Sequence, residues 1–452
     1  MTRRAIFFVL FMIATLSVTV CNAQLWIITT FAGNGLGSYG GDGGLAKLAG
    51  LVDPSGVATD RKGNIYVADQ NNNRIRKVNA AGVISTIAGT GAFGYSGDGG
   101  LADTAKLSGP TGVAVDKYGN IFIADEFNNV VRKIDTSGIM STVAGNGTQG
   151  FSGDSALAIH AEMWSPADVA VDTFGNLYIV DQDNNRVRKV DTLGIMTTLA
   201  GTGVAGFNGD TIAANTAQLN FPEGIAVDKN GDVYIADLYN NRVRKVDVAS
   251  GIITTVAGNG IGGYSGDDSM ALNAEIYNAS AVAVDDSGDI YISDFYNNRI
   301  RKVRAATGII TTIAGNGTGG YSGDDSLATN GEIFRPQGVA VDSSGSVFIA
   351  DFDNHVVREV SKVDTGTATT GISAISEPGF AVFPNPSHGR FTVRSNGMVR
   401  AIVYNEIGER VFDADIDGTK GVLDISTQPA GIYLLYLRSG KSTFVRKLEV
   451  IR

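Results

Sequence analysis

One sequence pattern recurs six times along this chain of 452 residues, and it constrains the fold more than any other feature. The first copy reads Ala-Asp-Gln-Asn-Asn-Asn-Arg-Ile-Arg-Lys-Val and occupies residues 68–78. The aspartates of the six copies follow one another at intervals of 56 or 57 residues and are Asp69, Asp125, Asp181, Asp237, Asp294 and Asp351. A repeat of this length indicates one supersecondary unit that is copied along the chain.

Each unit predicts four short strands. In the second unit, runs rich in β-branched residues at 112–116, 121–124, 130–134 and 139–144 are separated by Asp, Asn and Gly turns. This pattern is typical of an all-β sandwich, barrel or propeller, and six equal units favour a six-bladed β-propeller around a central channel. A fourth-strand sequence precedes the first complete unit and none follows the sixth. Residues 25–32 are therefore expected to close the ring as the outer strand of the last blade, which would cover both open sheet edges.

An insert of about twenty residues links each fourth strand to the next unit, and its length is constant, which favours a packed segment over a loose loop. In each insert an aspartate is expected to be a turn or N-cap residue before a short helix, such as 101–107. These aspartates are Asp42, Asp98, Asp154, Asp210, Asp267 and Asp324. The inserts and the Asn-rich turns should emerge on the same face, where we expect any ligand surface.

The repeated motif Pro-x-Gly-Val-Ala-Val-Asp-x-x-Gly-Asn-Ile-Tyr-Ile-Ala-Asp-x-x-Asn-Asn-Arg-Ile-Arg-Lys-Val resembles the NHL repeat family over roughly residues 25–362. The resemblance implies a six-bladed propeller that most often serves as a binding platform. We assign residues 24–363 to this propeller.

Both ends of the chain carry features of export. Residues 1–23 read as a signal peptide, with Arg3 and Arg4 before an apolar run and a cleavage site between Ala23 and Gln24. Cleavage there would remove Cys21, the one cysteine, and leave a mature chain without a membrane span.

Residues 364–379 read as a linker, and alternating strands and turns in 380–452 predict a small β-sandwich. Segments such as Phe383-Pro-Asn-Pro-Ser-His-Gly-Arg-Phe-Thr-Val393 resemble the C-terminal sorting domain of the Bacteroidetes type IX secretion system. The resemblance implies that the type IX machinery handles residues 380–452 and removes them. The protein would then be secreted or attached to the cell surface.

The net charge of −10 disfavours nucleic acid as a partner, because binding to phosphate backbones depends on Lys and Arg. The motif arginines, five of which are followed by Lys and one by Glu359, could still form a local basic ring. We favour pairing of these arginines with aspartates of the blades. They are Arg76, Arg132, Arg188, Arg244, Arg301 and Arg358.

Sequence signals for catalysis are sparse, and we predict that the protein is not an enzyme and has no cofactor. Five inserts contain Gly-x-Gly-x-x-Gly, but outside the βαβ context of a dinucleotide site. Calcium is an alternative at Asp267-Asp268 and Asp324-Asp325, although no insert has the ligand order of a dedicated loop. The propeller has two histidines, His160 and His355. The competing hypothesis is a metal-dependent lyase or lactonase at the channel.

An aromatic residue recurs in the inserts and could stack on sugars or dock a peptide, or pack its own insert onto the blade. The predicted role is recognition or scaffolding outside the cell, with a protein or glycan partner. Specificity should come from residues that break the repeat. The candidate binding residues are Tyr95, Asp98, His160, Trp164, Tyr264, Asp267, Tyr321, Asp324, Arg335 and His355, and Phe334 also departs from the repeat.

Overall fold

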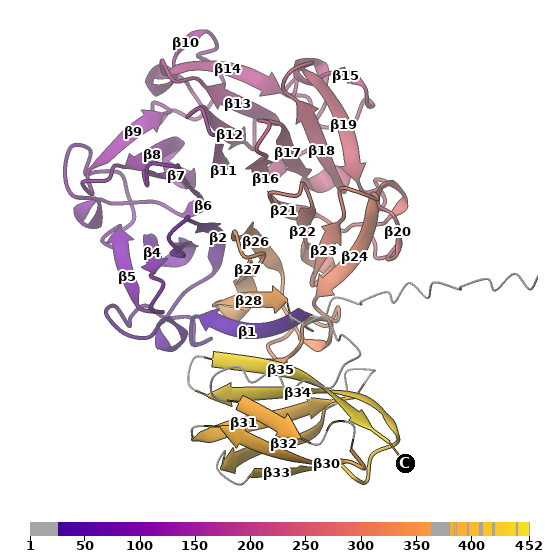
Figure 1. Ribbon diagram of the computed structural model, residues 1–452. Coiled ribbons are helices and arrows are strands. Elements are labelled where there is room, and N and C mark those ends of the chain that lie inside the picture. The colour runs from indigo at the N-terminus through magenta and orange to yellow at the C-terminus, as the bar shows by residue number, and fades with distance from the viewer. Residues whose placement is uncertain are drawn as a thin grey trace, which may run out of the picture.

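A computed structural model describes residues 26–362 and 380–451, except for 384, 386, 396, 406–409, 418–420 and 440–441. The predicted signal peptide, its cleavage site at Ala23 and Gln24, and the predicted linker lie outside the described residues. The rest is all-β and forms a ring of six sheets with a smaller β-domain beside it (Figure 1). The six-bladed propeller predicted from the repeats is confirmed.

Each blade is an antiparallel meander whose first strand lines the channel. Blade one contains β2 (Pro54–Thr59), β3 (Ile65–Asp69), β4 (Arg74–Val78) and β5 (Ile84–Ala88). Blade two contains β6 (Pro110–Val115), β7 (Ile121–Asp125), β8 (Val130–Ile134) and β9 (Met140–Ala144). Blade three contains β11 (Pro166–Val171), β12 (Leu177–Asp181), β13 (Arg186–Val190) and β14 (Ile195–Ala200).

The remaining blades repeat this order. Blade four contains β16 (Pro222–Val227), β17 (Val233–Asp237), β18 (Arg242–Asp247) and β19 (Ile252–Ala257). Blade five contains β21 (Ala279–Val284), β22 (Ile290–Asp294), β23 (Arg299–Val303) and β24 (Ile309–Ala314). Blade six contains β26 (Pro336–Val341), β27 (Val347–Asp351), β28 (Val356–Lys362) and the N-terminal β1 (Trp26–Ala32).

The two ends of the propeller sequence meet in blade six. There β1 pairs antiparallel with β28, in a register that opposes Ile28 to Val360 and Thr30 to Arg358. Figure 1 shows the indigo β1 beside the orange β28. This is the ring closure that the sequence predicts, and it leaves no blade without its outer strand.

The motif turn is built around an aspartate and an asparagine. After β7, a 3-10 turn, η4 (Glu126–Asn128), ends at Asn129 with φ of 54°, in the left-handed region that Asn tolerates better than most residues. The same geometry follows β3, β17, β22 and β27. The turns are η2 (Gln70–Asn72), η7 (Leu238–Asn240), η9 (Phe295–Asn297) and η11 (Phe352–Asn354), and in blade six His355 takes the left-handed position.

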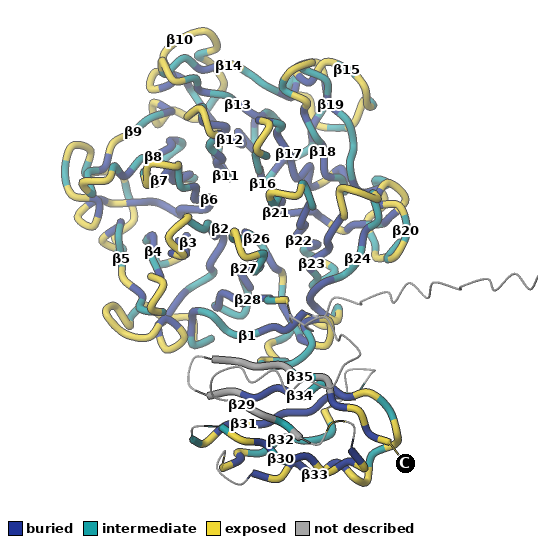
Figure 2. The backbone as a smooth tube through the Cα atoms, in the orientation of Figure 1, coloured by how far each residue is buried: buried dark blue, intermediate teal, exposed yellow. Residues whose placement is uncertain are grey.

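The inserts pack against the outer strands, as their constant length predicts, and Figure 2 shows them as exposed segments around the ring. Four of them contribute a two-residue strand to the edge of the next blade, for example β10 (Ala156–Leu157), which pairs with β14. The others are β15 (Ile212–Ala213), β20 (Ser269–Met270) and β25 (Ser326–Leu327). Every insert also forms a 3-10 turn: η1 (Ala46–Leu48), η3 (Ala102–Thr104), η5 (Ala158–His160), η6 (Ala214–Thr216), η8 (Ala271–Asn273) and η10 (Ala328–Asn330).

The expected helix at 101–107 is wrong. Only η3 forms there, its N-cap is Leu101, and no side chain caps it. The physical reason is pairing with the next outer strand: Gly99 and Ala102 donate their backbone N–H groups to Met140 and Gly138, so the main chain cannot continue as a helix. Asp98 is therefore not an N-cap, and its carboxylate is engaged elsewhere.

The smaller domain is the predicted β-sandwich. One sheet has the order β29-β30-β33 and the other β32-β31-β34-β35, with Phe391, Leu423 and Leu435 buried between them. The strands are β29 (Phe380–Phe383), β30 (Arg390–Ser395), β31 (Met398–Tyr404), β32 (Arg410–Asp417), β33 (Gly421–Asp424), β34 (Gly431–Ser439) and β35 (Ser442–Val450). The sandwich packs beside blade six, where Tyr404 donates its hydroxyl to the carbonyl oxygen of Asp325 at 2.6 Å.

Candidate binding face of the propeller

Every blade contains a buried arginine held between two aspartates. In blade two, Arg132 has no exposed surface and lies 2.7 Å from Asp98 in the insert and 3.5 Å from Asp125 in the motif. The other five buried arginines pair with their own two aspartates in the same way. The predicted pairing is therefore present, and these arginines do not form an exposed basic ring.

The two aspartates of this network differ in environment. Burial raises the pKa of Asp125 to about 6, against the hydrogen bonds from Asn128 and Ser108. Burial also acts to raise the pKa of Asp98, but the Thr142 hydrogen bond and the Arg132 guanidinium outweigh it and lower that pKa. Asp98 is thus an ionised partner of the buried Arg132. The same contact holds Asp267 against Arg301 and Asp324 against Arg358, both at 2.7 Å.

The insert aromatics lie over this network. Tyr95 donates its hydroxyl to Asp98 at 3.0 Å, and the Arg132 guanidinium lies 4.7 Å from its ring centroid. Tyr264 makes the same contacts with Asp267 and Arg301, while the hydroxyl of Tyr321 bonds Thr30 and its ring faces Arg358. Each aromatic therefore anchors its insert, yet about half of each of these three tyrosines stays exposed.

An asparagine clasp joins each blade to the next. In blade two, Asn129 accepts a hydrogen bond from the backbone N–H of Ser165 in the following blade at 3.1 Å. At the ring closure His355 replaces the asparagine, and its Nδ1 accepts from the backbone N–H of Asp53 at 3.2 Å. His160 lies in η5 at blade three, on the other side of the ring from blade six. The structure therefore does not bring the two predicted histidines together.

Trp164 and Arg335, two of the residues that break the repeat, lie where an insert ends beside a motif turn. Trp164 donates its backbone N–H to Asp181, and Arg335 pairs with Asp353 at 3.3 Å. The sequence does not predict three aromatic contacts at or beside this junction. Their ring centroids are 5.0 Å apart for Phe221 and Tyr239, 4.9 Å for Tyr277 and Tyr296, and 6.5 Å for Phe93 and Phe127. Nothing in the repeat alignment marks these pairs, because their members lie 18 to 34 positions apart.

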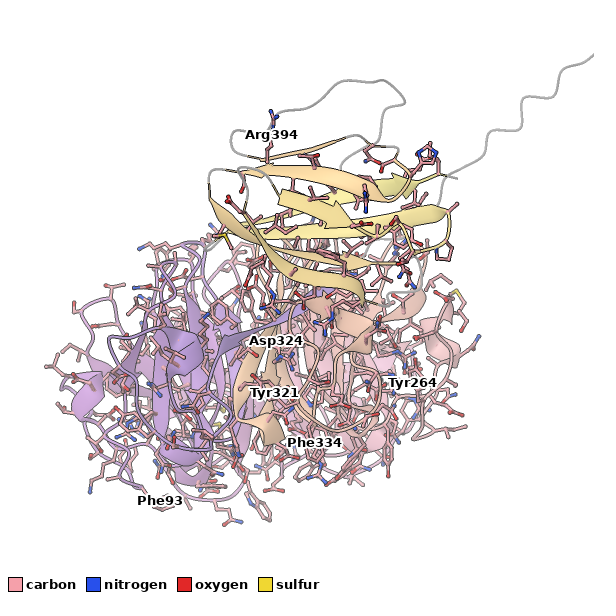
Figure 3. The ribbon with its side chains drawn as sticks, turned by 90° about the horizontal axis from the view of Figure 1, so that it is seen from below. Phe93, Tyr264, Tyr321, Asp324, Phe334 and Arg394 are labelled. Carbon is pink, nitrogen blue, oxygen red and sulfur yellow. The ribbon has the colours of Figure 1, made fainter. Side chains whose placement is uncertain are left out.

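A cleft of about 710 Å³ opens at blade two. Its walls include Tyr95 and Asp98 of one insert, Phe127 of the motif turn and Ile159 of the next insert. The motif turn and the insert also touch directly, since Asn128 donates to the carbonyl oxygen of Gly94 at 2.9 Å. In Figure 3, Phe93 lies at the lower side of the propeller, away from Arg394 of the smaller domain. Of the ten predicted residues, Tyr95 and Asp98 line this cleft.

The channel is narrow and acidic. Its cavity of about 80 Å³ is lined by the first strands of the blades and includes Asp168 and Glu223. Burial raises the pKa of Asp168 and of Glu223 to about 7 each. Burial and the nearby Asp183 charge raise the pKa of Glu126 to about 7 as well. Gln337 bridges to Glu223 at 2.9 Å and Asp168 accepts the backbone N–H of Ile225, so these groups also tie blades together.

Models of known families match both parts of the chain. The NHL repeat matches residues 219–246, 277–303 and 335–358, and the Teneurin NHL domain matches 37–95 and 91–151. The secretion system C-terminal sorting domain matches residues 381–451. No helix in the described ranges is long and apolar enough to cross a membrane.

Curated relatives share the propeller region. Human Teneurin-4 is 33% identical over 290 residues, which cover 55% of this chain and 10% of that protein. The Arabidopsis thaliana protein SUPPRESSOR OF QUENCHING 1, chloroplastic, is 27% identical over 325 residues, which cover 69% of this chain and 30% of that protein. The chain thus spans less than a third of the length of these relatives.

Solved structures share the fold. A protein described as an auxiliary nutrient binding protein from Bacteroides thetaiotaomicron has a TM-score of 0.55 at 17% identity, covering 75% of this chain and 77% of its own. Its counterpart from Bacteroides ovatus has a TM-score of 0.54 at 16% identity, with the same coverage of each chain. Because the motifs, the blades and the terminal sandwich agree with these matches, the chain is an NHL-repeat β-propeller that carries a type IX C-terminal sorting domain for export to the cell surface or beyond.

Proposed function

We propose that the propeller is a recognition module that binds a protein or glycan partner on the end of the ring where motif turns and inserts meet. The cleft of blade two carries this proposal. Its volume of about 710 Å³ lies within the range of about 300–1,000 Å³ that small-molecule and cofactor pockets occupy. It combines exposed Phe127, Tyr95 and Ile159 with polar groups, a mixture that suits specific recognition.

The fold supports this role by rigidity. The six Asp–Arg–Asp networks and the clasps between blades fix the turns, so a partner would bind a surface that is already ordered, which reduces the entropy lost on association. The acidic channel and the net charge of −10 argue against nucleic acid as that partner. Binding is described for the two Bacteroides propellers, but for this chain their likeness establishes only the fold.

The alternative is a metal-dependent lyase or lactonase that acts in the channel. The raised pKa values of Glu126, Asp168 and Glu223 favour it, because perturbed carboxyl groups gather at catalytic sites. The channel cavity of about 80 Å³ opposes it, since ligand pockets occupy about 300 Å³ or more. Within the described ranges, no three or more His, Cys, Asp or Glu side chains are grouped to hold a metal. We therefore propose a non-enzymatic role without a cofactor.

A screen of the full chain against glycans and extracellular proteins tests the proposal, with two alanine variants of exposed aromatics. Phe127→Ala removes a wall of the cleft, and Phe174→Ala removes an exposed aromatic from the β11–β12 turn at the opposite end of a blade. We expect Phe127→Ala to weaken partner binding at least about tenfold and Phe174→Ala to leave it unchanged. Equal affinity of both variants and the native chain would contradict the proposed face.

A further inference from the structure

A second arginine occupies the outer part of four blades. In blade one it is Arg74, whose guanidinium carbon lies 3.6 Å from the centroid of Tyr39. The guanidinium donates to the carbonyl oxygens of Asn72 and Thr90 at 3.0 and 2.6 Å. Blades three, four and five repeat these contacts with Arg186, Arg242 and Arg299 over Phe151, Phe207 and Tyr264.

Blade two keeps the walls of this arginine site and lacks the arginine. Val130 stands where blade one has Arg74, while Tyr95, Asn128 and Asn146 stand where blade one has Tyr39, Asn72 and Thr90. All four of these blade-two residues line the cleft of about 710 Å³. We call them the blade-two socket.

The glycine next to this site in each blade shows whether the space of the guanidinium is filled. A Cβ at Gly91 in blade one would collide with the guanidinium group of Arg74. At the equivalent Gly147 the nearest atom would be the carbonyl oxygen of Asn128 at 3.7 Å. The volume that a guanidinium fills in four blades is therefore open in blade two. It is open in blade six as well, where a Cβ at Gly35 would first meet the carbonyl oxygen of Asn354 at 3.7 Å, but the blade-two position is the one that lines the cleft of about 710 Å³.

Blade two also lacks the positive charge that the second arginine brings to blade one. Blade one sets Asp42 and Asp69 against two arginines, Arg74 and Arg76. Blade two sets Asp98 and Asp125 against Arg132 alone. Within this set of residues blade two is one positive charge short, so a cation in the socket would restore the balance that four other blades have.

We propose that the blade-two socket binds an arginine side chain of a polypeptide partner. This inference rests on the proposed recognition role and names the group recognised. The guanidinium would stack on Tyr95 and donate to the carbonyl oxygens of Asn128 and Asn146, as Arg74 does in blade one. A planar fork of N–H donors suits this arrangement of ring and carbonyl groups better than an ammonium does. Phe127 and Ile159, which flank the socket, would contact apolar neighbours of that arginine.

The first test measures binding of N-acetyl-arginine methylamide to the full chain by saturation-transfer NMR, with the lysine and citrulline counterparts as matched probes. We expect saturable binding of the arginine compound, at least tenfold weaker binding of the lysine compound and no binding of the citrulline compound. An arginine compound that does not bind, or a citrulline compound that binds equally, overturns the proposal.

The second test fills the socket from within. Val130→Arg supplies the arginine that blades one, three, four and five carry, so we expect the variant to fold with an unchanged or higher unfolding midpoint and to lose the blade-two binding event. Val356→Arg, the same replacement in blade six, should leave that event intact. Retention of native stoichiometry and affinity in folded Val130→Arg overturns the proposal, as does loss in Val356→Arg alone. If the arginine compound fails but a partner found in the screen still responds to Phe127→Ala, the socket inference falls and the recognition role stands.

Discussion

The buried arginine of blade two should matter far more to stability than the exposed end of its network. Arg132→Met leaves the carboxylate of Asp125 without its cation, while the side chain of Asp125 has no exposed surface and keeps only the hydrogen bonds from Ser108 and Asn128. Removing one partner of a buried ion pair costs about 3–5 kcal/mol. Asp98→Asn removes the other carboxylate, which is 39% exposed. The carboxylate end of this pair is open to solvent, and the amide oxygen that replaces it can still accept from the Arg132 guanidinium. This variant should therefore lose less than Arg132→Met, on the order of 1 kcal/mol.

Guanidinium unfolding of both variants beside the native chain measures the two losses, since a shift of the midpoint at constant slope reports a change in stability. The loss in Arg132→Met should also shrink at acidic pH. Burial raises the pKa of Asp125 to about 6, so below that pH the stranded carboxyl group can take up a proton and lose its charge. If Arg132→Met loses no more than Asp98→Asn at neutral pH, the ion pair does not carry the stability that its burial implies.

Three further predictions concern the channel, the ring closure and metal. Glu223 has a folded pKa of about 7, above its unfolded value. Its contribution to the free energy of unfolding is therefore fully present below the unfolded pKa and is lost as the pH rises through 7. Glu223→Gln should therefore remove up to about 3 kcal/mol of the fall in unfolding free energy between pH 5 and pH 8, and an unchanged pH profile would contradict this. His355→Asn should keep the native stability because the amide oxygen can accept from the N–H of Asp53, whereas His355→Ala should lose about 1–3 kcal/mol by chemical unfolding. EDTA should leave the melting temperature unchanged, because Asp267 and Asp324 of the calcium alternative already pair with arginines. Stoichiometric metal whose removal lowers that temperature would show that calcium binds.

The blades could be predicted from the sequence because their signals are local and repeated. Alternating β-branched residues, the Asp and Asn turns and the fixed spacing each act within one unit, and six copies reinforce one another. Ring closure could also be predicted, because one orphan strand sequence at residues 25–32 matched one missing strand in blade six. The Asp–Arg pairing was predictable on the general ground that a charge repeated in every blade needs a partner.

The inserts could not be predicted in the same detail because their conformation depends on the next blade. Residues 101–107 contain good helix formers, but the backbone hydrogen bonds from Gly99 and Ala102 to Met140 and Gly138 of the next outer hairpin take priority. The aromatic pair of Phe221 and Tyr239 is likewise formed by an insert end and a turn that only the fold brings together. Local propensity carries no information on such contacts.

Residues that depart from the repeat fall into two physical classes. One class keeps a contact between blades, and the other leaves a contact unmade. Some keep a tie between neighbouring blades. Nδ1 of His355 accepts where Oδ1 of Asn129 does. Beside Ala167, which has no hydroxyl to donate as Ser55 does, Asp168 instead accepts the backbone N–H of Ile225 in the next blade. Such changes preserve the ring. Val130 belongs to the other class, because it keeps the surrounding walls and leaves the contacts of Arg74 unmade. A repeat protein therefore contains its own set of reference sites. Where an unmade contact is surrounded by retained partners and also opens into a cleft, as at Val130, it marks the binding position proposed for blade two and the chemistry of the group that fits it.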